Sequence, residues 1–270
     1  IKENKHWMST ENRMLAVNSG TSGELAKDVF FAYRGYRMNY YAVTAMLARV
    51  YCWAGEYGNA YKEAKEVVDA TYSTGSTSTA SCFNFSNSLT TNRKDYNSII
   101  MTFFKSTCYE DYLPYMTKGN DVVLVVNTTN LFGDEAGADD RNLDLFGDWD
   151  GGDIKYSFKY DIKEGTSGTD MIPAIRLSEM YYIMGEYFAY KDEFSKAGEM
   201  LDKVRYARGI STTNLASSIG SLEVFHTHLI KEMRREFVGE GQMFFQYKRL
   251  DQKPKDNVVF VFDKPNNEDI

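Results

Sequence analysis

"TAMLARVY" (Thr44–Tyr51) and "GNAYKEAKEV" (Gly58–Val67) recur, in the sizes of their side chains, as "YYIMGEYF" (Tyr181–Phe188) and "SKAGEMLDKV" (Ser195–Val204). Each copy has the order large-x-x-large-small-x-x-aromatic, followed by small-x-x-x-apolar. This is the spacing of a tetratricopeptide helix pair, two antiparallel helices joined by a tight turn. The chain is therefore predicted to contain two such pairs.

Small side chains stand where the two helices of each predicted pair would meet. The facing positions are Ala48 with Ala60, and Gly185 with Ala197. Antiparallel helices approach closely only where the side chains between them are small. A glycine inside a helix costs about 1 kcal/mol relative to alanine, so Gly185 is best explained by close packing.

The rest of the chain predicts a mainly α fold in a single domain with long irregular loops and a few short strands. Residues 121–126 ("DVVLVV") and 258–262 ("VVFVF") are typical of short strands. A last helix is expected over 222–239, with Ser221 as its N-cap. Within one domain, residues 1–270, we expect four parts: a helix pair at about 40–70, a loop-rich excursion at about 71–171, a helix pair at about 173–208, and a C-terminal helix and tail at about 221–270.

Composition excludes several functional classes. The 270 residues are 43% hydrophobic and carry a formal net charge of -7, which argues against nucleic acid or an anionic lipid surface as the main partner. The three cysteines are scattered, and His226 and His228 point to different faces of a helix. No run of 18 apolar residues and no Walker, Rossmann or G-x-S-x-G motif is present. We therefore expect no metal and no cofactor.

The stretch "RREFVGEGQMFFQYKRL" (Arg234–Leu250) sets two arginines and two glutamates around a glycine. It could be a catalytic carboxylate pair, a charged groove or a structural network. We expect Arg234, Arg235, Glu236 and Glu240 to tie the last helix to the repeat scaffold through charge-assisted hydrogen bonds.

A second charged stretch, Gly133–Asp153, holds eight carboxylates and one arginine. Carboxylates this close repel each other unless water or a hard cation such as calcium lies between them. Asp148, Asp150 and Asp153 do not have the EF-hand spacing. A solvated acidic loop is favoured, and a calcium site stays open.

Four stretches, in this order, resemble the SusD/RagB-like outer-membrane lipoproteins of glycan-foraging bacteria. They are "YYAVTAMLARVYCWAGEYGNAYKEAKEVV", "DDRNLDLF" with Lys159–Tyr160 after it, "IPAIRLSEMYYIMGEYF" with "LDKVRYARGI", and "RREFVGEGQMFFQYKRL". Two features depart from the family: Met243 and Gln246 replace an Arg and an Asp of its closing motif, and typical members are considerably longer. The chain resembles the central and C-terminal portion of these proteins, which implies a single SusD-like domain. The resemblance also implies a structural pair between Asp140 and Arg141.

The resemblance implies binding of an oligosaccharide or other small nutrient at the cell surface, without catalysis. Delivery would be to a TonB-dependent SusC-like transporter, with the protein held at the outer membrane by a lipid anchor outside this chain. Two alternatives stay open. One is a tetratricopeptide adaptor that binds peptides or proteins. The other is a glycoside hydrolase, which needs two carboxylates about 5 Å apart, or about 6.5 to 9.5 Å apart.

Aromatic residues of the excursion are the candidate glycan contacts. A pyranose has an apolar face and a hydroxyl rim, so its site pairs a flat ring with polar groups. Trp149, between Asp148 and Asp150, is the first candidate; a tryptophan that packs the loop onto the scaffold is the structural alternative. The further ligand-binding candidates are Tyr96, Tyr109 and Tyr112, with Asn92, Arg93 and Asp111 as polar neighbours.

Overall fold

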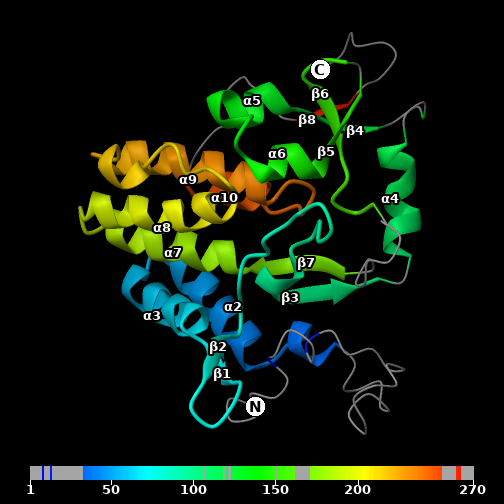
Figure 1. Cartoon of the computed structure of the whole chain (residues 1–270). Helices are drawn as coiled ribbons and strands as arrows, with labels where there is room; N and C mark the ends of the chain where they lie inside the picture. The colour runs from blue at the N-terminus through cyan, green and yellow to red at the C-terminus, as the bar shows by residue number, and fades with distance from the viewer. Residues whose placement is uncertain are drawn as a thin grey trace, which may run out of the picture.

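The computed structural model describes residues 8, 13, 33–105, 107–117, 120, 123–149, 151–161, 171–250 and 260–262. Stacked helices form one side of the molecule, and a strand-containing part with short helices covers one end of the stack (Figure 1). The predicted mainly α fold is confirmed. No helix among these described residues is both long and apolar enough to cross a bilayer.

The two predicted helix pairs are present. The first comprises α2 (Tyr40–Trp53) and α3 (Tyr57–Val68), and the second α7 (Leu177–Ala189) and α8 (Phe194–Ala207). Asn39 caps α2 by accepting a hydrogen bond from the Ala42 backbone N–H at 3.1 Å. Helix α3 packs directly on α7 (Figure 1), so two repeats that are far apart in sequence form one continuous stack.

The small residues lie at the close approaches, as predicted. Ala48, Ala60 and Ala197 are fully buried. A methyl group added at Gly185 would lie 3.4 Å from the Ala197 carbonyl oxygen and 3.2 Å from Cζ of Phe225. Gly185 therefore admits a third helix, the one that carries Phe225, as well as its own partner helix.

The excursion between the pairs contains more regular structure than its sequence pattern predicts. It includes the following elements: β1 (Thr71–Ser73), β2 (Thr79–Ser81), η4 (Tyr96–Ser98), β3 (Ile99–Phe104), α4 (Cys108–Met116), β4 (Leu124–Asn127), α5 (Thr128–Phe132), η5 (Gly133–Glu135), α6 (Asp140–Leu145), β5 (Phe146–Asp148) and β6 (Ile154–Ser157). Each element is too short to show a clear period. Strands β3 and β4 each take a partner from beyond the excursion, whereas β1 pairs with β2 and β5 with β6 inside it.

Besides the β1–β2 hairpin, two antiparallel sheets order the described part of the excursion. Strand β3 pairs with β7 (Met171–Arg176), which leads directly into α7. A four-stranded sheet has the order β5-β6-β4-β8, with β8 at Phe260–Phe262. The two predicted strands are found as β4 and β8, and Val125 lies opposite Val261.

The last long helix is α9 (Leu222–Glu236), and Ser221 caps it by accepting from the Val224 N–H at 3.2 Å. Its apolar stripe packs against the second helix pair, and Phe225, Leu229 and Met233 are buried there. The short helices η3 (Arg34–Tyr36), η6 (Leu215–Ser217) and α10 (Met243–Arg249) complete the described elements.

Candidate functional site

The glutamate at the end of α9 lies in a buried network of ion pairs. Glu236 accepts hydrogen bonds from Arg208 Nη2 at 2.6 Å and from Arg141 Nη1 at 3.2 Å. Arg208 follows α8, and Arg141 lies in α6. All three side chains are nearly inaccessible to solvent. Glu236 therefore joins α9 to the second helix pair and to the excursion.

Glu240 makes a similar junction. It accepts from Arg176 Nε at 2.7 Å and from Lys159 Nζ at 2.8 Å. Arg176 is the N-cap residue of α7. The structural role predicted for Glu236 and Glu240 is therefore confirmed by their contacts.

Two predicted pairings in this region are wrong. Arg235 does not reach the repeat scaffold; it donates to Glu135 Oε2 at 2.6 Å and to the Phe132 carbonyl at 2.7 Å, both in the excursion. Arg141 pairs with Asp139 at 2.7 Å rather than with Asp140. Asp139 is the N-cap of α6, and this position turns its carboxylate back towards the helix.

Electrostatics oppose a catalytic role for this cluster. Burial alone would raise the pKa of Glu236, but the guanidinium groups of Arg208 and Arg141 outweigh it and hold the pKa far below its usual range. A general acid for glycoside cleavage needs a raised pKa. Glu236 is therefore suited to holding elements together and unsuited to donating a proton.

Trp149 lies in the turn between β5 and β6, at the edge of the four-stranded sheet. Its backbone N–H donates to the Ile154 carbonyl at 3.2 Å, and its side chain is half-buried. Asp148 is exposed, and its carboxylate accepts from the Gly151 N–H at 2.8 Å, which closes the turn. Asp150 lies outside the described residues.

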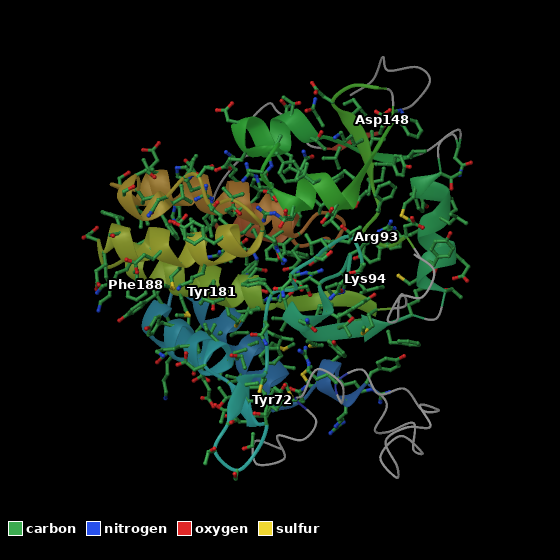
Figure 2. All side chains as sticks on the ribbon, in the orientation of Figure 1. Tyr72, Arg93, Lys94, Asp148, Tyr181 and Phe188 are labelled. Carbon is green, nitrogen blue, oxygen red and sulfur yellow. The ribbon has the colours of Figure 1, made fainter. Side chains whose placement is uncertain are left out.

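Three other candidates lie close together in residues 92–96, before β3. The Tyr96 side chain is only 8% exposed in an apolar cluster with Tyr36, so its ring offers no open face to a ligand and the predicted contact is wrong. Asn92 accepts from the Tyr96 N–H at 3.0 Å. Arg93 pairs with Asp161 at 2.8 Å. Figure 2 shows Arg93 well away from Asp148, so the structure does not bring the predicted set together.

Helix α4 carries the remaining candidates. Tyr109 is half-buried, and Tyr112 stacks on Tyr160 with ring centroids 4.2 Å apart and an interplanar angle of 14°. Asp111 is exposed and pairs with Lys105. The α4 helix thus offers aromatic rings beside charged groups at a second place in the excursion.

Two adjacent exposed aromatic residues of β3 were missed by the sequence analysis. Phe103 and Phe104 end β3, and each is 60% exposed. Phe104 stacks on Tyr33 with centroids 6.0 Å apart. The sequence signal for their exposure is the pair of adjacent phenylalanines before Lys105 at the end of a strand. Neighbouring strand residues point to opposite faces, so both rings cannot lie on the same buried face.

A sequence model of the SusD family matches residues 48–264, most of the chain. The chain belongs to the SusD family. No curated protein sequence matches it.

Solved structures of SusD-family proteins share its fold. A SusD superfamily protein from Bacteroides thetaiotaomicron VPI-5482 is 22% identical, with a TM-score of 0.60 over 83% of this chain and 52% of that chain. A SusD-like carbohydrate binding protein from Bacteroides vulgatus ATCC 8482 is 19% identical, with a TM-score of 0.56 over 81% and 46%. A laminarin binding SusD-like protein is 16% identical, with a TM-score of 0.54 over 81% and 56%.

The chain therefore spans about half the length of the SusD-family structures it matches. At these identities the likeness concerns the fold.

Proposed function

We propose that this SusD-family protein binds a glycan or similar nutrient at the cell surface and delivers it to a TonB-dependent SusC-like transporter. Membership of the SusD family is the observation that carries the proposal. Two structural neighbours described as carbohydrate binding and laminarin binding support the ligand class. Attachment to the outer membrane would use a lipid anchor.

The β5–β6 turn is the proposed contact surface. The protein fixes the orientation of a half-buried aromatic ring and leaves part of the ring surface accessible to a sugar. The Trp149 side chain is half-buried in this way. The neighbouring Asp148 carboxylate is exposed and can accept from sugar hydroxyls. Tyr109 and Tyr112 on α4 are proposed as a second set of contacts.

Binding without bond cleavage is part of the proposal. The carboxylates at the end of α9 support it, because Glu236 and Glu240 are buried and already paired with cations. A glycosidase carboxylate must face the scissile bond of the sugar across a cleft.

A binding experiment with matched variants tests the proposed surface. A glycan array on the full-length protein identifies a ligand, and calorimetry then compares Trp149→Ala with Trp53→Ala. Trp53 is a 43% exposed tryptophan on α2 and serves as the control. An aromatic contact of about 0.5 to 1.5 kcal/mol predicts about 2- to 12-fold weaker binding for Trp149→Ala, and Trp53→Ala should bind like the wild type.

The outcomes separate the alternatives. Equal affinities of both variants would remove Trp149 from the site. Early melting of Trp149→Ala with normal binding once folded would favour the loop-packing role of this residue. Release of reducing ends from the ligand, lost in a carboxylate variant, would favour a hydrolase. Capture of a transporter without any response to glycans would favour an adaptor.

A further inference from the structure

A small cavity lies where the excursion, the second helix pair and α9 meet. The volume open to the centre of a water-sized particle is about 10 Å³, which is room for one such particle. Six cationic side chains line it: Arg93, Lys94, Arg141, Lys159, Arg176 and Arg208. Figure 2 shows Arg93 and Lys94 close together between the upper, strand-containing part and the β3–β7 ribbon.

The cavity lining has unused hydrogen-bond donors. Arg208 is 2% exposed, and its Nε and Nη2 atoms bind Glu236 and Asp95, but its buried Nη1 has no partner among the residues that the structure describes. Within the same part of the chain, Arg93 Nε is also buried without a partner. An unsatisfied buried N–H costs about 1 to 3 kcal/mol, so an acceptor is expected between these groups.

The two carboxylates that line the cavity are already occupied. Glu236 accepts from Arg208 and Arg141 through its two oxygens. Asp95 accepts from Arg208 at 2.7 Å and from the Ser86 N–H at 2.9 Å. A water molecule in this position would have to donate two protons as well as accept, whereas an anion only accepts.

The charges around the cavity favour an anion for a second reason. Other carboxylates pair with the lining cations, among them Glu240 with Lys159 and Arg176, and Asp161 with Arg93. These carboxylates do not line the cavity, so the cations lie nearer to its centre. Burial is the main cause that lowers the pKa of Lys159; Glu240 opposes it, and the nearby Arg176 adds to it.

We infer that this cavity binds one small monovalent anion of the size of chloride. Its volume excludes phosphate, sulfate and sugar acids. The anion would join the loop that carries Arg93 to Arg208, the residue that follows α8. It would act as a structural ion at the junction of the repeat scaffold and the excursion, independently of glycan binding.

Thermal unfolding of the full chain at constant ionic strength tests this inference. Replacing sodium gluconate by sodium chloride or bromide, from 5 to 200 mM, is expected to raise the unfolding midpoint by about 2 to 5 °C, because the halide binds only the folded state. Gluconate is too large for the cavity. In crystals soaked in bromide, an anomalous peak is expected between Arg93 and Arg208.

Matched variants separate this site from general salt effects. Arg93→Lys keeps the charge and removes the Nε donor, so it should lose most of the halide-dependent shift. Arg49→Lys changes an arginine of α2 that pairs with Glu179 and does not line the cavity, so it should keep the full shift. Equal midpoints of the wild type in halide and gluconate, a full shift in Arg93→Lys, or a cavity without bromide would each overturn the inference.

Discussion

Gly198 provides a sharp test of the packing, because adding one methyl group there should destabilise the protein although alanine is the better helix former. Gly198 lies in the middle of α8, against η6. A methyl carbon at this position would lie 2.6 Å from the backbone N and Cα of Ala216. Ordinary contacts between such atoms are about 3.5 to 4.0 Å, so the η6 backbone has to move by about 1 Å.

That movement is opposed by hydrogen bonds. The N–H groups of Leu215 and Ala216 both donate to Asp202 Oδ2, at 2.8 and 3.1 Å. Overpacking in a close-packed interior costs about 1 to 3 kcal/mol. The cost here should be near the upper value, because the methyl group would clash with backbone atoms rather than with a flexible side chain. The helix propensity of alanine offsets about 1 kcal/mol. Gly198→Ala should therefore lower the free energy of unfolding by about 2 kcal/mol.

The matched control is Gly58→Ala in α3, where no atom of the described residues lies within 4 Å of the added methyl group. This variant should be more stable than the wild type by up to about 1 kcal/mol. Urea denaturation measures the change in the free energy of unfolding for each variant. In thermal unfolding, Tm should fall by about 4 to 8 °C for Gly198→Ala. An unchanged or raised stability of Gly198→Ala would refute the packing of α8 on η6.

Three further predictions concern α9 and its partners. Glu236→Gln removes one carboxylate partner from each of two buried arginines and should cost about 3 kcal/mol in urea denaturation. Glu223→Gln, at an exposed position of α9, should cost less than about 0.5 kcal/mol. Ser221→Ala removes the helix cap and should cost about 1 kcal/mol; an unchanged midpoint would mean that the cap is not formed. Burial alone would raise the pKa of Glu135, but Arg235 and Lys231 outweigh it and lower the pKa from 4.5 to about 2. The stabilisation by Glu135 should therefore be complete above pH 4.5 and disappear as the pH falls to about 2, so the stability gap between wild type and Glu135→Gln should close over this range; a constant gap would contradict the ion pair.

Local sequence patterns were sufficient for the helix pairs and for α9. The period of 3.6 residues, the small side chains at Ala48 and Gly185, and the cap at Ser221 each involve residues that are close in the chain or in matching positions of a repeat. Such features arise from backbone geometry and side-chain size, so they are visible without coordinates. The four stretches that resemble the SusD family are of the same kind.

Contacts between distant segments were decided only by the tertiary structure. Tyr96 looked like an exposed loop aromatic, but it begins η4, directly before β3, and lies in an apolar cluster. Arg235 looked like a link to the scaffold, yet its partners come from α5 and η5. Charge and ring type show what a side chain can bind, whereas its partner depends on which segments the fold brings within about 4 Å.

The candidate glycan surface shows the same division. In the sequence, Trp149 is recognised as a candidate by its acidic neighbours. Its half-buried state and its separation from Arg93 depend on the β5–β6 turn and on the path of the excursion in space. The clash at Gly198 and the cation-lined cavity arise where elements far apart in sequence meet. The amino-acid sequence by itself thus determined the helices and the family. Tertiary packing decided which side chains are buried, which ions pair and which rings are exposed, because these properties depend on distances between segments that no local sequence period encodes.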